Sequence, residues 1–213
     1  PTHHEAFRAG FGMMVGTGRE FVEDQIRWAS NLMVMPFHKI IASVPVGAHM
    51  WVPMDDENTM LYCVDFLPHR PLTDEDVSRE TSWNGIHSEN APGTDRAIRN
   101  RDNDYLIDRA LQASGASYTG IKGLGTQDNG IQESMGPIAD RTREHLGVAD
   151  SAIIATRRFL LQTLKDHAAG ATPPGLDPTN YQVRSSRYTA PKDTPFAETM
   201  SRQISLEAVV AAE

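Results

Sequence analysis

The amino-acid sequence predicts an α+β fold, in which an antiparallel sheet is crossed by one long helix. Two β-rich runs stand early in the chain, at Phe11–Val15 and Ile26–Val34, where apolar and small residues are bounded by glycine and charge. A second pair of β-rich runs lies within Ala48–Leu67. The strongest helical pattern comes much later, over Asp150–Ala169.

The early glycine-rich segment, Gly12–Gly18, invites interpretation as a nucleotide-binding loop. It lacks a third glycine at the required spacing, and no periodic helix follows it, so a hairpin turn or bulge is favoured. The clearest β signal is Ala48–Leu67, where the polar turn formers Met54–Thr59 separate two strand-like runs. This pattern predicts an antiparallel hairpin, with Pro53 at a strand end where a missing N–H is tolerated.

The middle of the chain predicts short elements and a loop. Thr73 precedes three acidic residues, which favours the start of a short helix or turn. Residues Thr81–Thr94 are rich in Asn, Gly, Ser and Pro and predict a long loop. Asp104–Ala113 predicts a helix, which offers four residues to a core: Tyr105, Leu106, Ala110 and Leu111.

The long helix has clear boundaries. Asp150 is its expected N-cap, and Gly170 followed by Pro173 and Pro174 ends it. Five aliphatic residues at helical spacing are expected to face the sheet: Ile153, Ile154, Leu160, Leu161 and Leu164. We expect a domain over residues 1–170. Residues 171–213 hold five of the thirteen prolines, which predicts an irregular C-terminal tail that wraps the domain or contacts a neighbour, with a weak helix near Ser205–Ala212.

Composition limits the possible functions. Hydrophobic residues make up 39% of the 213 residues and charged residues 23%, so a packed core is expected. The net charge of −8 argues against a nucleic-acid surface, which would need clustered Lys and Arg. Cys63 is the one cysteine, and its isolation fits a reducing, cytoplasmic location. No run approaches the roughly 18 apolar residues of a membrane span, so no membrane is expected as a partner.

The segment Gln127–Gly147, QDNGIQESMGPIADRTREHLG, is the most informative stretch. It combines an early aspartate, a Glu-Ser-Met-Gly-Pro turn and alternating charges, between the segment Asn100–Arg109 and the long helix. This arrangement resembles the C-terminal part of the catalytic domain of the Rieske non-haem iron oxygenases, the large (alpha) subunits that hydroxylate aromatic rings. The phthalate-dioxygenase-like group is the most similar. The resemblance covers residues 7–170 and implies a helix-grip fold, of which this chain holds a partial catalytic domain.

The resemblance assigns Asp128 as the catalytic residue and as the carboxylate ligand of a mononuclear iron. In the family, two histidines and one carboxylate hold Fe(II) and leave three positions open for dioxygen beside the substrate. An isolated aspartate after a glycine-rich loop is otherwise most often a helix cap. Glu133, five residues further on, is the alternative ligand, or it caps or braces the turn.

The two histidine ligands of the family form an Asp-x-x-His-x4-His motif upstream of the carboxylate. None of the eight histidines of this chain pairs at that spacing. His3 and His4 are adjacent and are interpreted as solvent-exposed polar residues. We therefore expect the ligand pair upstream of Pro1, together with the Rieske [2Fe–2S] cluster, whose two cysteines and two histidines this chain cannot supply. Cys63 is interpreted as a small core residue.

Three further motifs have simpler interpretations. Ser134 lacks the Gly-x-Ser-x-Gly elbow of a hydrolase. The glycines of 120–125 lack the Lys-Ser/Thr of a phosphate loop and favour close backbone packing or mobility near the iron. Charged residues alternate over 141–145 and predict a solvated face, with a docking surface for a reductase or a neighbouring subunit as the alternative.

The resemblance implies part of an oxygenase that hydroxylates or demethylates an aromatic acid or ether with dioxygen. The whole protein would need Fe(II), the [2Fe–2S] cluster, and electrons from NAD(P)H through a reductase or ferredoxin, and would form a homo-trimer or a larger ring. This fragment alone is expected to be inactive and to bind iron weakly. The alternative is a metal-free helix-grip protein that binds an apolar small ligand between sheet and helix. The coding sequence upstream of Pro1 discriminates between the two.

Overall fold

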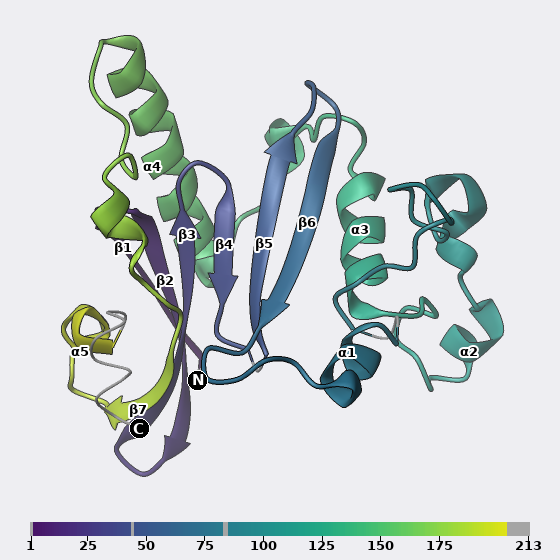
Figure 1. The fold of residues 1–213 in the computed structure, drawn as a ribbon, viewed down its shortest axis with the longest axis horizontal. Coiled ribbons are helices and arrows are strands. Elements are labelled where there is room, and N and C mark those ends of the chain that lie inside the picture. The colour runs from purple at the N-terminus through teal and green to yellow at the C-terminus, as the bar shows by residue number, and fades with distance from the viewer. Residues whose placement is uncertain (1, 44, 83–84, 204–213) are drawn as a thin grey trace. The chain divides into compact units, whose positions relative to one another are not determined.

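A computed structural model describes residues 2–43, 45–82 and 85–203 (Figure 1). The chain divides into two compact units. The first takes its residues from Pro1–Val52, Met60–Leu67 and His145–Glu213, and the second from Pro53–Thr59 and Pro68–Glu144. Within the described part of the chain, no helix has the length and apolar character needed to cross a membrane.

The first unit is built on a seven-stranded sheet. Six strands follow one another in chain order: β1 (Thr2–Ala9), β2 (Gly12–Val22), β3 (Gln25–Val34), β4 (His38–Ile41), β5 (Val46–Pro53) and β6 (Thr59–Phe66). The strand pairs from β1–β2 through β4–β5 are antiparallel, as predicted. The predicted hairpin is confirmed as β5 and β6, whose turn closes when the Met54 N–H donates to the Asn58 carbonyl at 3.0 Å.

The seventh strand comes from the far end of the sequence. β7 (Arg187–Pro191) pairs with the first half of β3, while β4 pairs with its second half. After β7, α5 (Phe196–Gln203) places Phe196 and Met200 in the core. The segment expected as a tail thus contributes a strand and a helix that pack on the sheet. The weak helix predicted near Ser205–Ala212 lies outside the described residues.

The glycines of β2 make room for this packing. A Cβ at Gly16 would stand 2.2 Å from the Phe196 ring, and one at Gly18 would stand 2.8 Å from Trp28. The hairpin turn or bulge predicted for Gly12–Gly18 is therefore wrong, because these residues lie inside β2 with a regular register. The strand predicted at Phe11–Val15 is confirmed from Gly12 onward. The core around this strand consists of Phe11, Met14, Ile26, Trp28, Leu32, Val34, Ala190, Phe196 and Met200.

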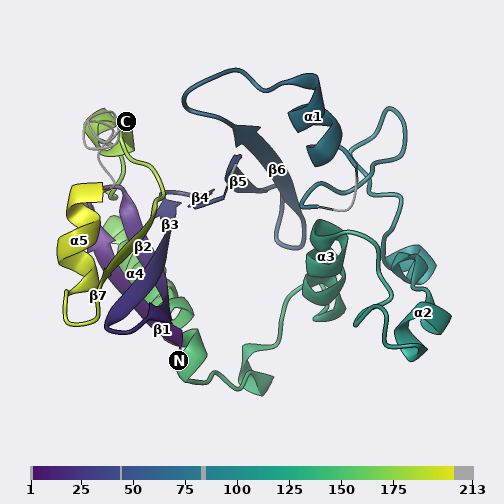
Figure 2. The ribbon, with the colours of Figure 1, turned by 90° about the horizontal axis from the view of Figure 1, so that it is seen from below.

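The long helix α4 (Ser151–Ala168) runs along β1 and β2, as two perpendicular views show (Figures 1 and 2). Its predicted boundaries are confirmed: Asp150 is at the N-cap, within η3 (Val148–Asp150), and Gly170 follows the C-cap with φ of +92°. The Asp150 carboxylate, however, accepts the Gly147 N–H rather than a helical one. An antiparallel sheet with a long helix on it is the predicted α+β, helix-grip type of fold.

The face of α4 that packs on the sheet differs from the prediction. Ala152 and Phe159 are buried and Ile154 and Leu160 half-buried, but three of the expected core residues are exposed: Ile153, Leu161 and Leu164. Apolar residues surround much of this helix, so periodicity alone cannot orient it. The contact is determined by two buried residues on one face of α4, which are Phe159 and, two turns before it, the small Ala152. The Phe159 ring lies 5.5 Å from the Arg8 guanidinium of β1.

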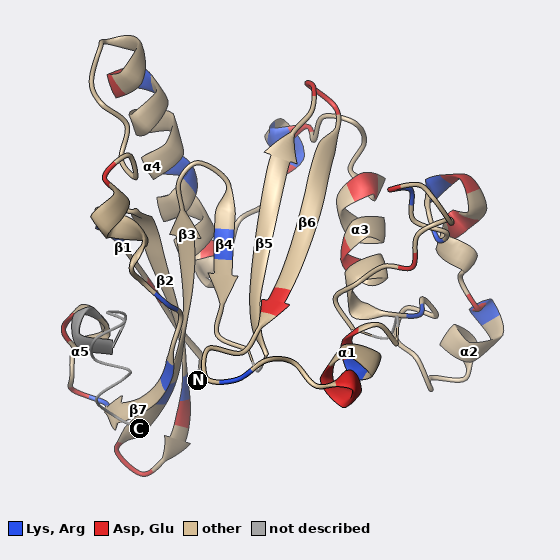
Figure 3. Ribbon diagram, viewed as in Figure 1, with Lys and Arg blue, Asp and Glu red and all other residues tan. Residues whose placement is uncertain are grey.

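The second unit consists of short helices and loops. Its elements are α1 (Asp74–Glu80), η1 (Arg101–Leu106), α2 (Arg109–Ala113), α3 (Leu124–Ser134) and η2 (Arg141–Arg143). The predicted helix start at Thr73 is confirmed by a capping box with Asp76, and Figure 3 shows the acidic residues that α1 carries. Over its described residues, the predicted loop 81–94 forms neither a helix nor a strand beyond an isolated bridge at Asn90. A further short helix, η4 (Pro178–Tyr181), belongs to the first unit.

The single helix predicted over Asp104–Ala113 is wrong. The chain breaks between η1 and α2, because Asp104, Tyr105 and Leu106 have positive φ and Asp108 starts a new helix by accepting the Leu111 N–H. Of the four residues expected in a core, Tyr105 alone is buried, and Leu106, Ala110 and Leu111 are exposed.

Candidate functional site

The candidate site lies on α3 of the second unit. The helix begins after Gly123, whose φ of +85° turns the chain into it, and ends before Gly136, whose φ is +89°. It therefore starts three residues before the segment Gln127–Gly136 that the sequence indicated. Asp128 is the fifth residue of this helix and cannot be its N-cap, so the helix-cap alternative for Asp128 is excluded.

Asp128 stands on an exposed, otherwise apolar face. Leu124, Ile131 and Met135 follow the same side of α3 at helical spacing, and each is about half exposed or more. Among the described residues, the Asp128 carboxylate has neither a hydrogen bond nor an ion pair. A carboxylate without partners on an apolar stripe is free to serve as a ligand of a metal ion.

Other residues of α3 contact the preceding loop. The Gly125 N–H donates to the Gly85 carbonyl at 3.0 Å, and a Cβ at Gly125 would stand 1.8 Å from the Ile86 oxygen. The Asn129 amide donates to the Ser88 hydroxyl at 3.3 Å, which lies 3.5 Å from the buried Thr126 hydroxyl. The predicted close backbone packing of this glycine-rich segment is confirmed.

Glu133, the alternative ligand, accepts two hydrogen bonds from the turn before α2. Its carboxylate accepts the Tyr105 O–H at 2.5 Å, and its backbone carbonyl accepts a hydrogen bond from Arg101. Burial and then the Glu133 carboxylate raise the pKa of Tyr105 to about 12. Five residues correspond to about 140° around a helix, so Glu133 and Asp128 point to different sides of α3. Sequence reasoning had proposed that Glu133 braces the turn, but it missed the partner, Tyr105.

The two adjacent histidines lie in β1 of the first unit, where neighbours point to opposite faces of the sheet. His3 and His4 are half-buried, so they are less exposed than the sequence interpretation expected. The His3 ring lies 6.4 Å from that of Trp28, with Nε2 3.9 Å from a Glu20 oxygen. Two ligands of one metal would have to share a side, and these two do not.

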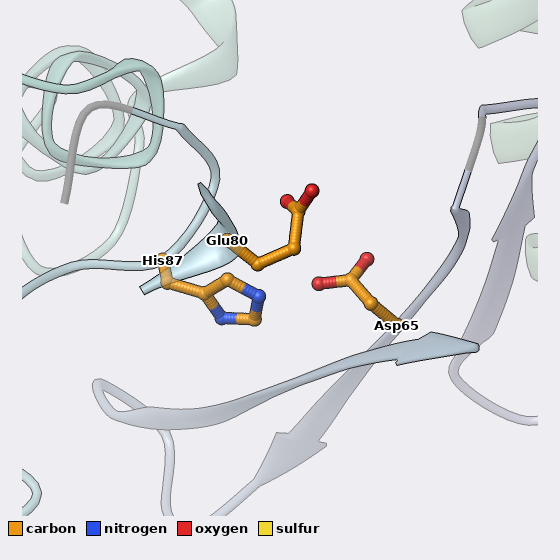
Figure 4. A group of neighbouring side chains, drawn as sticks. All are labelled: Asp65, Glu80 and His87. Carbon is orange, nitrogen blue, oxygen red and sulfur yellow. The ribbon is translucent and has the colours of Figure 1, made fainter. Parts of the chain in front are cut away.

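Donor side chains that sequence reasoning did not single out are labelled in Figure 4. In the second unit, a carboxylate oxygen of Glu80, at the end of α1, and a ring nitrogen of His87 lie within 4.8 Å of each other. Glu80 also pairs with the Arg79 guanidinium at 3.2 Å. Asp65, on β6 of the first unit, adds to the burial that raises the pKa of the half-buried Cys63 thiol.

The remaining motifs keep their simpler interpretations. The Ser134 hydroxyl donates to the Ile131 carbonyl of its own helix at 2.7 Å. Arg141 and Glu144 form an exposed ion pair at 3.0 Å, which supports a solvated face over 141–145.

Comparison with known proteins extends these observations. A family model described as "LigXa C-terminal domain like" matches residues 19–212. The 3-chlorobenzoate-3,4-dioxygenase oxygenase subunit of Comamonas testosteroni is 32% identical over 80% of this chain and 44% of its own length. The phthalate 4,5-dioxygenase oxygenase subunit of Pseudomonas putida is 34% identical over 74% of this chain and 36% of its own length. The chain thus spans less than half the length of either relative.

Proposed function

Because this chain belongs to the LigXa C-terminal-domain-like family, among the oxygenase large subunits of the phthalate-dioxygenase-like group, we propose that it bears the iron carboxylate of an aromatic-ring-hydroxylating oxygenase. The proposed substrate class is an aromatic acid, because both relatives are named for substrates that carry a carboxylate on a ring. Activity on aromatic ethers, including their demethylation, remains a prediction from the sequence resemblance.

One observation carries the proposal: Asp128 is exposed on α3 and has no partner among the described residues. Two other side chains of the same helix, Asn129 and Glu133, are held by hydrogen bonds. A single hard oxygen donor of this kind fits Fe(II), which accepts carboxylate and imidazole ligands. Asp128 would supply one ligand, and two histidines would come from the rest of the full-length protein. When bound, Fe(II) would supply the activation of dioxygen.

The side chains next to Asp128 would shape the reaction site. Leu124 and Ile131 lie one turn before and one turn after the carboxylate, on the same face of α3. Where a bound substrate or the rest of the full-length protein covers this face, such apolar neighbours would exclude water, which strengthens the electrostatic attraction between a carboxylate and a cation. They also offer an aromatic ring an apolar contact beside the iron position.

The proposal extends to the whole protein. Electrons would come from NAD(P)H through a reductase or ferredoxin and a [2Fe–2S] Rieske cluster, and the subunits would form a homo-trimer or larger ring. A cytoplasmic location stays a prediction from the single cysteine. Residues 1–170 are proposed as the catalytic domain.

The decisive experiment is Asp128→Ala in the full-length protein, with Glu133→Ala as the matched control on the same helix. We expect Asp128→Ala to lose iron and hydroxylated product together while it keeps the visible absorbance of the Rieske cluster. Glu133→Ala should remain loaded at saturating iron. Iron per subunit and product per unit time are the measurements.

The opposite pattern, with iron and product lost only in Glu133→Ala, would move the ligand to Glu133. If both variants keep iron and turnover, the oxygenase proposal fails and the metal-free protein that binds an apolar ligand takes its place.

A further inference from the structure

The turn Asp104–Leu106 has an unusual backbone. Its three residues have φ of 52°, 53° and 51°, the left-handed region, and none of them is glycine. A side chain with a Cβ is strained in this region, and strain of this kind persists only where the surroundings enforce it. Three strained residues in succession, beside the proposed iron helix, call for a functional explanation.

The surroundings do enforce it. The Asn100 N–H donates to the Asn103 side-chain oxygen at 3.0 Å, and the Asn103 amide donates to the Ile98 carbonyl at 2.6 Å. The Tyr105 N–H then closes the turn onto the Asn100 carbonyl at 2.9 Å. The two asparagines therefore hold the strained residues through hydrogen bonds that do not involve α3.

The left-handed turn delivers one side chain to α3. Tyr105 is 8% exposed, and its ring lies 3.6 Å from the position that a Cβ at Gly130 would occupy. Its hydroxyl donates to the Glu133 carboxylate. Gly130 and Glu133 are three residues apart and share a side of the helix, about 140–160° around from Asp128. Tyr105 therefore holds α3 from the side that Asp128 does not use.

We propose that Tyr105 is a positioning residue for Asp128, because its contacts with Gly130 and Glu133 fix the rotation of α3 about its own axis. This inference rests on the function proposed above. A rotation of about 10° would move a helical carboxylate by about 1 Å. Metal ligation tolerates displacements of only about 0.5 Å, so the hydrogen bond between Tyr105 and Glu133 controls how well Asp128 reaches the iron.

The experiment uses the full-length protein and four variants: Tyr105→Phe, Glu133→Ala, the double variant, and Glu133→Gln, whose amide oxygen still accepts the Tyr105 O–H. The dissociation constant for Fe(II) is measured by competition with a chelator, and the melting temperature is measured without metal. Tyr105→Phe and Glu133→Ala should each weaken iron binding about fivefold. Because both remove the same bond, the double variant should bind no more weakly than either single variant. Glu133→Gln should bind like the unaltered protein.

Two results would overturn the inference. One is a lower melting temperature of Tyr105→Phe with an unchanged dissociation constant, which would make Tyr105 a structural residue only. The other is an additive loss in the double variant, which would mean that the two residues act separately. Asp128→Ala, measured in parallel, distinguishes a failure of this inference from a failure of the proposed function. It should weaken Fe(II) binding by about 100-fold or more. If it binds iron normally, the proposed function fails whatever Tyr105 does.

Discussion

The two units of this chain are stabilised in different ways. The first has a continuous apolar core, in which the Phe196, Met14, Leu32 and Met200 side chains are fully buried. Among the described residues of the second, Tyr105 is the one large apolar side chain that is buried, and Asp76 and Thr126 are the buried polar ones. The first unit therefore depends on packed volume, whereas the second depends on backbone conformation and hydrogen bonds. This contrast predicts which substitutions each unit tolerates.

The largest effect is expected where the first unit loses volume. Phe196→Ala removes a buried ring that packs against Trp28 at 4.6 Å and Phe7 at 5.7 Å between centroids, and it should cost about 3–5 kcal/mol of unfolding free energy. Urea denaturation of the full-length protein measures this. Leu176→Ala, an exposed residue, is the control. An unchanged midpoint for Phe196→Ala would show that α5 contributes nothing to the core.

The second unit should be most sensitive to substitution where two segments of its backbone are in contact, at Gly125 and Ile86. Gly125→Ala places a methyl group against the Ile86 carbonyl, which cannot move as a side-chain tip would, and should cost about 2–3 kcal/mol. Amide hydrogen exchange should show lost protection in α3 with an intact sheet. Gly115→Ala is a control with open space, although its φ of +76° adds strain of its own. Equal loss of protection in both units would show that the two units do not differ in how they are stabilised.

A smaller effect is expected at low pH, where α1 of the second unit should lose stability. The Arg70 guanidinium, followed by the Thr73 N–H and hydroxyl, holds the pKa of the Asp76 carboxyl well below its usual range. Because the folded-state pKa is lowered, the stabilisation of α1 is fully present above the unfolded pKa of about 3.9 and is lost as pH falls below it. Amide exchange in α1 should accelerate only below about pH 4, and Asp76→Asn should remove this dependence. A transition in α1 near neutral pH would contradict this assignment.

The smallest effect is expected on the outer face of α4. Leu161 and Leu164 are 59% and 64% exposed, so replacement of either by alanine should change the unfolding free energy by less than about 0.5 kcal/mol. Phe159→Ala on the same helix, which is buried, should cost about 3–5 kcal/mol. A large loss at Leu161 would mean that this face packs on another surface in the full-length protein.

Local patterns were sufficient for much of the fold. The β5–β6 hairpin, the start of α1 at Thr73 and both ends of α4 each depend on a few neighbouring residues, and each was predicted correctly. The family match likewise confirms the resemblance that Gln127–Gly147 and its surroundings had indicated.

The errors came from features that periodicity does not encode. A run of positive φ at Asp104–Leu106 replaced the expected helix, because hydrogen bonds from Asn100 and Asn103 outweigh the helical preference of the sequence. Apolar residues surround much of α4, so its buried face had to come from packing on β1. The role of Asp128 as an iron ligand stays a proposal, although its exposed position on α3 became visible only in three dimensions.

The divided pairing of β3 has a consequence for synthesis on the ribosome. Ser30, in the middle of β3, donates its hydroxyl to the carbonyl of Ser186, which is 156 residues later in the chain. At a translation rate of about 5–20 residues per second, β7 is synthesised about 8–30 s after the first half of β3 with which it pairs. During that interval the backbone groups of this half of β3 and the apolar surface beneath α5 face the solvent. We therefore expect the nascent chain to need a chaperone at this strand until β7 emerges.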